Sequence, residues 1–198
     1  WNEQFKKEKS ADNNPATIAG WNSSEESILI ATAHHANDNI ETLLMNFFKG
    51  TGINGLDGIL PRQTWIVRPL LFAKKDELLE FAKENQLSYV EDSSNASDKY
   101  TRNYFRNRLI PSIQKVFPQV EDNLLNNIQR FHEIKQVYEE AMRSKKESLV
   151  EIKNNEEHIS ILKLKKAFPF RTTLWEIIRE KGYTAGQLDE IIKLMDAD

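Results

Sequence analysis

Acidic and histidine side chains gather in the stretch 31-ATAHHANDNIETLL-44, where His34 and His35 precede Asp38 and Glu41. Asp38 and Glu41 are i, i+3 neighbours, so on a helix they share a face. Two carboxylates on one face can hold Mg²⁺ or an ammonium group, because both prefer hard anionic oxygens. The same letters also fit an ordinary helix start, with Asp38 as the N-cap and Glu41 completing a capping box. Both interpretations stay open on this stretch alone.

A metal-dependent phosphohydrolase is an alternative, because such enzymes also use clustered His and Asp. His34, His35, Asp38 and Glu41 would then be metal ligands. Adjacent histidines at a strand end diverge, however, so only one of the two would face the site. The remaining histidines, His132 and His158, have no acids at ligand spacing. Spacing therefore favours this alternative only weakly.

Two further stretches carry groups suited to phosphate. The loop 49-KGTGINGLDG-58 offers Lys49 and glycine backbone, although it is not a Walker A loop. The segment 99-KYTRNYFRNRLIPSIQK-115 has five basic residues and no acidic one. Arg102 and Arg106 are four residues apart and share one helix face, and Arg suits bidentate phosphate contacts. A solvated helix face with core aromatics is the plainer interpretation of this segment.

The elements that position these groups follow from hydrophobic patterning. The apolar run 28–33 predicts a buried strand, and 64–71 predicts a second one. Helices are expected over 38–48 and 74–86. Strand–helix–loop–strand–helix is typical of a parallel α/β sheet, in which ligands bind beyond the carboxyl ends of the strands. The histidines and the two acids then lie at such an end.

The pattern becomes helical after residue 100. Helices are predicted from about Thr101 to Ile110, where Pro111 would end the first, and from Val120 to Val150. A short strand is expected within 157–167, followed by two helices, the last with a capping box of Thr184 and Gln187. We therefore predict an α/β domain followed by an all-α part, with domains at 1–118 and 119–198.

Composition narrows the class of protein. The chain has 198 residues, 39% of them hydrophobic, a formal net charge of −3 and no cysteine. Disulfides and Cys-ligated zinc are therefore excluded for these residues, and no apolar run reaches the ~20 residues of a membrane span. We expect a cytoplasmic protein without membrane contact. The opening 1–10 is typical of a helix end and 11–27 of a surface loop, so we expect a fragment of a longer protein.

The motifs taken in order resemble one family. HHANDNIET, KGTGINGLDGI, RPLL, EDSSN and RNYFRNRLIP are similar in order and spacing to tRNA(Ile)-lysidine synthetases, which are PP-loop (N-type) ATP pyrophosphatases with an adenine nucleotide alpha hydrolase-like fold. The likeness is close over about residues 30–113 and looser in the helical part. Each motif is modest alone, whereas five in sequence are specific.

The resemblance implies a two-step reaction on tRNA(Ile) with a CAU anticodon. ATP adenylates the C2 oxygen of the wobble cytidine and releases pyrophosphate; free L-lysine then attacks C2 and displaces AMP. By the same resemblance Asp38 and Glu41 hold Mg²⁺ or the lysine ammonium, and Arg102 and Arg106 neutralise pyrophosphate or tRNA. Other nucleotide contacts fall to His34, His35, Thr42, Lys49, Gly50, Thr51 and Gly52, and Arg108 joins the two arginines on tRNA.

The chain departs from the family in two ways. The family often has consecutive acids after the histidines, where this chain has Asn37-Asp38, which shifts weight to Asp38 with Glu41. Its SGGxDS phosphate loop does not occur in these residues, so we expect the chain alone to be inactive and the parent protein to be the ligase. The alternatives are another PP-loop tRNA-modifying enzyme and a non-catalytic tRNA-binding module.

Overall fold

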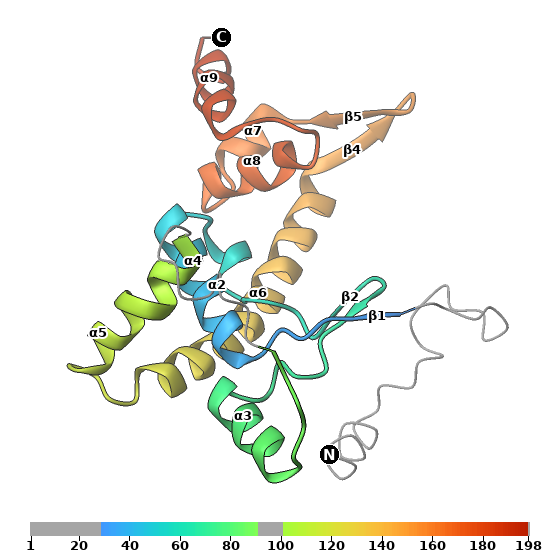
Figure 1. The fold of residues 1–198 in the computed structure, drawn as a ribbon. Helices are drawn as coiled ribbons and strands as arrows, with labels where there is room; N and C mark the ends of the chain where they lie inside the picture. Colours follow the sequence, from blue (N-terminus) through green and yellow to red (C-terminus); the bar gives the residue numbers. More distant parts are fainter. Residues whose placement is uncertain (1–28, 91–100, 198) are drawn as a thin grey trace, which may run out of the picture.

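The computed structural model describes residues 29–90 and 101–197. The expected helix end at 1–10, the loop at 11–27 and the EDSSN stretch lie outside the described residues. The rest forms two parts joined by one long helix (Figure 1). The first part is a small sheet with helices around it, and the second is a helical cluster with a β-hairpin. The predicted order, α/β followed by mainly helical structure, is confirmed.

The sheet has three short strands in the order β1-β3-β2. β1 (Ile30–Ala31) and β3 (Ile66–Val67) run parallel, as the sequence predicts, with Ile30 opposite Ile66. Both residues of β1 are exposed, so the prediction of a buried strand was wrong. β2 (Arg62–Gln63) pairs with β3 antiparallel. The hairpin between β2 and β3 was not predicted, because its turn residue Thr64 (φ 49°) is not one that favours the left-handed region.

Helix α2 (Ala36–Lys49) follows β1 and begins before Asp38, its expected start. Ile40 is fully buried and Leu43 nearly so, which confirms half of the predicted apolar face. Phe47 on the same face is 63% exposed, so the face reaches the core only near the start of the helix. The 3-10 turn η2 (Ile53–Gly55) and helix α3 (Lys75–Glu84) complete this part.

The basic segment is helical, but it does not stop at Ile110. It runs as α4 (Thr101–Tyr104), a π-helical turn η4 (Phe105–Leu109) and α5 (Ile110–Gln114). Pro111 falls in the first turn of α5, a position at which a missing backbone N–H costs little. The prediction that Pro111 ends the helix was therefore wrong.

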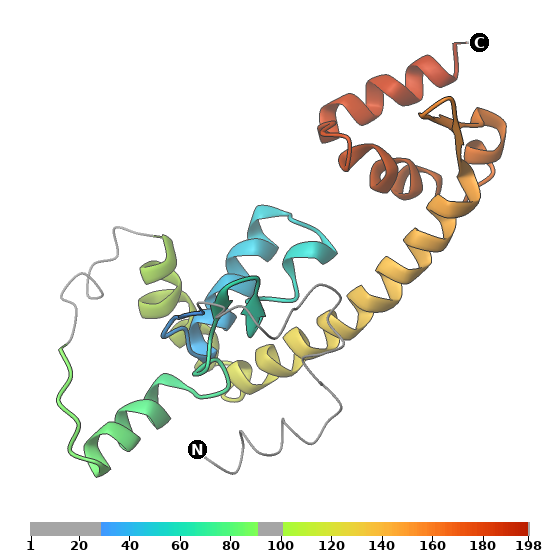
Figure 2. The same ribbon diagram turned by 90° about the vertical axis from the view of Figure 1, so that its right-hand side faces the viewer.

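Helix α6 (Val120–Leu149) links the two parts (Figure 2). Beyond it lie β4 (Val150–Lys153), β5 (Glu156–Ile159), α7 (Ile161–Lys165), α8 (Phe170–Arg179) and α9 (Ala185–Met195). Their core consists of Leu149, Leu164, Leu174, Ile177, Ile178 and Leu188. The predicted short strand, the two closing helices and the capping box at Thr184 are confirmed. None of the described helices is long and apolar enough to cross a membrane.

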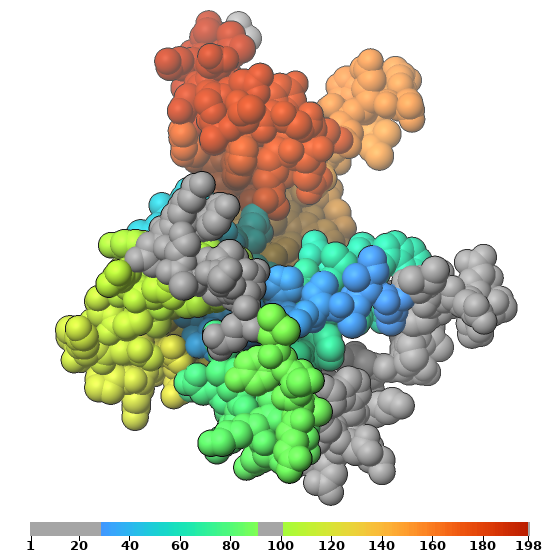
Figure 3. All heavy atoms as spheres, in the orientation of Figure 1, coloured from blue at the N-terminus to red at the C-terminus, as the bar shows by residue number. Residues whose placement is uncertain are grey.

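We call residues 150–197 the C-terminal unit. It lies at the top of the molecule in the space-filling view (Figure 3), and Figure 2 shows it at the far end of α6. The predicted domain boundary near residues 118–121 stays a prediction. Helix α6 begins at that point and packs on α2 as well as on α8.

Candidate active site

The start of α2 is built by His35 and Asp38. His35 is the N-cap residue, and its backbone N–H donates to Asp38 Oδ2 at 3.0 Å. Asp38 is therefore the N3 acid of the helix start and not its N-cap, which corrects the sequence interpretation. The preceding His34 holds its Nδ1 2.9 Å from the hydroxyl of Thr32. Glu41 has no capping role, and its carboxylate is available for other contacts.

Glu41 is held by a bidentate contact with Arg106. Its side chain is 1% exposed, and Arg106 donates from Nε to Oε1 at 2.6 Å and from Nη2 to Oε2 at 2.9 Å. Arg106 Nη2 also donates to Asp38 Oδ1 at 3.0 Å. One guanidinium thus joins both carboxylates of α2. Arg106 lies in the π-helical turn, a form of helix often found at functional sites.

Arg102 completes the cluster from one turn earlier. Its Nη2 donates to the Thr42 hydroxyl at 3.0 Å, whereas its distances to Asp38 and Glu41 are 3.9 and 3.8 Å. Its side chain is 38% exposed, against 22% for Arg106. The structure therefore brings together five of the predicted site residues, which we call the acid–arginine cluster: Asp38, Glu41, Thr42, Arg102 and Arg106.

Burial and charge act against each other in this cluster. Burial raises the pKa of the Glu41 carboxyl, and the Arg106 guanidinium opposes that rise. The hydrogen bond to Glu41 raises the pKa of Arg106 above its already high value. Burial lowers the pKa of His35, with Asp38 opposing. Arg106 is thus the permanent cation that keeps two nearby carboxylates compatible with a buried position.

The predicted Mg²⁺ site at Asp38 and Glu41 does not fit this arrangement. Arg106 donates to both Glu41 oxygens and to one Asp38 oxygen, so a metal ion would have to displace a guanidinium. Within residues 29–90 and 101–197, no three His, Asp or Glu side chains are placed to share a metal ion. A role for these two carboxylates toward Mg²⁺ therefore has no support in the geometry.

The glycine loop lies at the other end of α2. Lys49 ends that helix and Asp38 lies in its first turn, roughly 16 Å apart along the axis at 1.5 Å per residue. The Gly50 and Thr51 N–H groups already donate to Phe47 and Asn46 carbonyls. A helix C-terminus also disfavours an anion. The nucleotide role of Lys49, Gly50, Thr51 and Gly52 stays a prediction, and the structure does not bring these residues to His34 and His35.

Three asparagines of α2 hold the surrounding segments, a role that the sequence analysis missed. Asn37 accepts from the Lys75 N–H at 2.9 Å, Asn39 accepts from the Ile59 N–H at 2.6 Å, and Asn46 donates to the Gly55 carbonyl at 2.9 Å. The first contact orients the start of α3, and the others fix the glycine loop. Asparagine matches loop backbone because one amide both donates and accepts.

Gly58 and Asp57 anchor the loop further. Gly58 has a φ of +66°, and a Cβ there would lie 2.0 Å from Asn39 Oδ1, so only glycine fits. Asp57 is buried and pairs with Lys135 of α6 at 2.6 Å. The glycine spacing was a visible signal for the first contact. No local sequence pattern could have predicted the ion pair of Asp57 with Lys135, because the two residues are far apart in sequence.

This geometry defines an α/β domain whose polar cluster follows the carboxyl end of β1, the placement expected of a ligand site in such sheets. Comparison with known proteins adds to this description. Residues 18–113 match the family model of the PP-loop domain, and residues 151–198 match that of the TilS substrate binding domain. The chain thus carries matches to two domains, and it is similar to proteins named tRNA(Ile)-lysidine synthase. The PP-loop match implies ATP binding by the domain to which the cluster belongs.

Several relatives carry the name tRNA(Ile)-lysidine synthase. The chain is 33% identical to that of Parabacteroides distasonis over 161 residues, 81% of this chain and 36% of the relative. It is 37% identical to that of Thermotoga maritima over 113 residues, 57% of this chain and 27% of the relative. It is 48% identical to that of Borrelia garinii subsp. bavariensis over 88 residues, which are 44% of this chain and 20% of the relative. The chain thus spans about a third of the length of the Parabacteroides relative and less of the other two.

Proposed function

We propose that this chain is part of an ATP-dependent ligase that joins free L-lysine to C2 of the wobble cytidine of a CAU-anticodon tRNA(Ile), in the cytoplasm. The observation that carries the proposal is the acid–arginine cluster at the start of α2. The relatives' names and the matched substrate binding domain support tRNA as the substrate class. Each turnover would consume one ATP and release pyrophosphate and then AMP.

Within this reaction the residues of the cluster have separate tasks. Arg106 donates from Nε and Nη2 to the two carboxylates, so we assign it to positioning Asp38 and Glu41. The Asp38 side chain is 12% exposed against 1% for Glu41, so of the two carboxylates it is the one that can receive the lysine ammonium, which needs only hydrogen-bond acceptors and no fixed coordination shell. Arg102 has the looser contacts and the greater exposure, so it is the cation that can turn toward a phosphate. Mg²⁺ enters the proposal with ATP, without a site at Asp38 and Glu41.

The function is tested with the complete protein that carries this chain. We expect it to incorporate labelled lysine into a tRNA(Ile) transcript only when ATP is present, with one AMP and one pyrophosphate released per lysine. Mass spectrometry of the digested tRNA should place the added mass on the wobble cytidine. ATP consumption with a different modification would identify another PP-loop tRNA-modifying enzyme. Binding of tRNA without any ATP consumption would identify a binding module.

Reversing the charge of Arg102 tests the phosphate role. Arg102→Glu should weaken tRNA binding about tenfold at low salt, because one phosphate contact is replaced by repulsion. The difference should shrink as the salt concentration rises, since fewer counterions are released. Lys83→Glu on α3 is the matched control, an exposed cation outside the cluster, and should leave the affinity unchanged. Equal affinity of the Arg102→Glu variant and the wild type would make Arg102 a structural residue of the cluster.

A further inference from the structure

The first half of α6 is fixed to the part of the molecule that carries the acid–arginine cluster. Glu121 accepts from Asn37, the neighbour of Asp38, at 3.3 Å. Ile128 is buried, and α2, η2 and α5 all pack on this half of the helix. The last of these contacts along α6 is the ion pair of Lys135 with Asp57, whose side chain is 6% exposed. The start of α2 and the start of α6 therefore move as one body.

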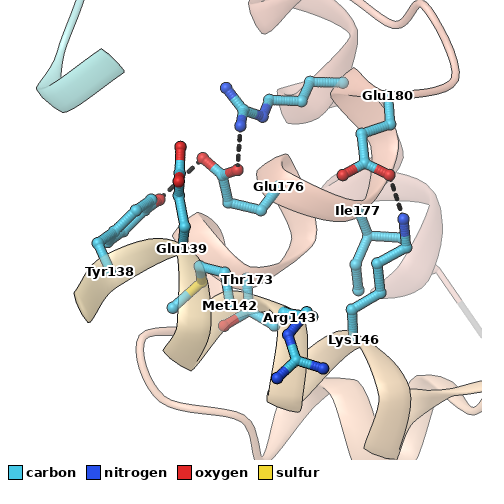
Figure 4. Close-up of a pocket in the computed structure, with 10 residues that line it drawn as sticks. Tyr138, Glu139, Met142, Arg143, Lys146, Thr173, Glu176, Ile177 and Glu180 are labelled. Carbon is cyan, nitrogen blue, oxygen red and sulfur yellow. Dashed lines mark hydrogen bonds and ion pairs between the residues drawn. The ribbon is translucent and has the colours of Figure 1, made fainter. Parts of the chain in front are cut away.

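The second half of α6 is fixed to the C-terminal unit. Tyr138 donates its hydroxyl to Glu176 of α8 at 2.8 Å, and Arg179 binds the same carboxylate at 2.7 Å (Figure 4). Burial, with the Glu176 hydrogen bond second, raises the pKa of Tyr138 to about 12, so the phenol remains a donor at neutral pH. Lys146 pairs with Glu180, one turn further along α8. These residues surround a cleft of about 360 Å³ between α6 and α8.

The two sets of contacts meet in the middle of α6. Among the side-chain hydrogen bonds and ion pairs of the described residues, Lys135 makes the last one to the first part along α6, and Tyr138 makes the first one to the C-terminal unit. Three residues of α-helix span only about 4.5 Å, less than one turn. An α-helix that is held by contacts on both sides of so short an interval has no free segment in which to bend or twist. Val137 in this interval is 72% exposed, and Ile134 just before it is 53% exposed, so neither part covers the outer side of the joint.

We infer that α6 is a rigid spacer that fixes the C-terminal unit relative to the acid–arginine cluster and thereby restricts which RNA is modified. The inference rests on the proposed function for its substrate. An RNA bound at both places must present its reactive base to α2 while its second contact lies at the C-terminal unit, the region that matches a substrate binding domain. An RNA whose two contact points are separated by a different distance loses one of the two contacts. The spacer thus contributes selectivity for folded tRNA over a shorter stem–loop.

The test changes the length of α6 between Gln136 and Val137 in the complete protein. Inserting seven helix-forming residues separates the joints by about 10 Å with about 20° of rotation, so both sets of contacts are kept. Inserting one alanine turns the C-terminal unit by about 100°. Both insertions should lower kcat/KM for full-length tRNA by about 100-fold, the size expected of substrate misplacement. Neither should alter kcat/KM for an isolated anticodon stem–loop, which reaches only the cluster.

A length-preserving control, Glu133→Ala with Gln136→Ala, changes the exposed side of the same turn and should leave both substrates unaffected. Unchanged use of full-length tRNA by the seven-residue variant would overturn the spacer. Distances between spin labels at Lys83 and Lys193 test rigidity independently of any activity. We expect one narrow distribution of distances in the wild type, and we expect the insertion to shift this distribution without broadening it. A broad distribution would overturn the inference even in a protein that modifies tRNA, whereas a narrow one in a protein that modifies no RNA would count against the proposed function alone.

Discussion

Replacing Arg106 with methionine is expected to lower the free energy of unfolding by about 3–5 kcal/mol, the cost of leaving a buried charge without its partner. Glu41 is almost completely buried and receives two hydrogen bonds from this one guanidinium. Methionine keeps much of the side-chain volume, so the loss is chiefly electrostatic. Urea unfolding of the complete protein measures the difference. Lysine incorporation should fall with it, because Asp38 loses the donor that orients it.

The pH dependence of this defect follows from Glu41. Burial already raises its pKa, and without Arg106 only the smaller effect of the Arg102 charge opposes that rise. A carboxyl whose folded pKa lies above its unfolded pKa destabilises the fold once it ionises. The defect of the Arg106→Met variant should therefore be greatest at high pH and shrink as the pH falls through the raised pKa. Wild type and variant should converge in stability toward acid pH.

Two controls separate a buried pair from an ordinary ion pair. Adding Glu41→Leu to Arg106→Met should recover most of the lost stability, because an apolar pair can replace a buried ionic one. Arg143→Met removes an arginine that also contacts two glutamates but is 60% exposed. It should change the stability little, because solvent screens an exposed ion pair. A similar small cost for Arg106→Met would show that Glu41 gains little from its partner.

The composition of the cluster was predictable, whereas its pairing was not. The spacing of Asp38 with Glu41 and of Arg102 with Arg106 places each pair on one helix face, as the structure confirms. Which guanidinium meets which carboxylate depends on how two helices distant in sequence cross. The helix start was misplaced because Asp is a preferred N-cap and His is not. Here α2 begins shortly after β1 ends, so that His35 occupies the N-cap position.

The glycine loop shows the opposite case. Its composition suggests a phosphate cradle, yet Gly50 ends a helix and Gly58 lets Asn39 approach the backbone. Glycine permits positive φ and close approach for any purpose, so the residue type alone cannot distinguish a ligand contact from an internal one. The deciding partners, Asn39 and Lys135, belong to α2 and α6. Long-range contacts of this kind are absent from any local pattern.

Replacing Asp38 with asparagine is expected to reduce lysine incorporation by about 100- to 1,000-fold, the loss typical of removing a charge-stabilising group from an active site. Asparagine keeps an oxygen that can accept from the His35 N–H, so the start of α2 should remain intact. The change therefore removes the negative charge while leaving the cap. If Asp38 receives the lysine ammonium, adenylation should continue. Pyrophosphate would then still be released in a single turnover, while AMP release and lysine transfer would fail.

Three measurements decide between this role and a purely structural one. Unfolding in urea should show little change in the Asp38→Asn variant, and tRNA affinity should be retained. Asp76→Asn is the matched control, since Asp76 is also an acid in the first turn of a helix but lies on α3, outside the cluster. It should behave as wild type in every assay. Wild-type lysine incorporation by the Asp38→Asn variant would show that Asp38 serves only the start of the helix. Loss of pyrophosphate release would show that Asp38 acts in the adenylation step. The expected pattern, adenylation without lysine transfer, is one that loss of a helix cap alone cannot produce.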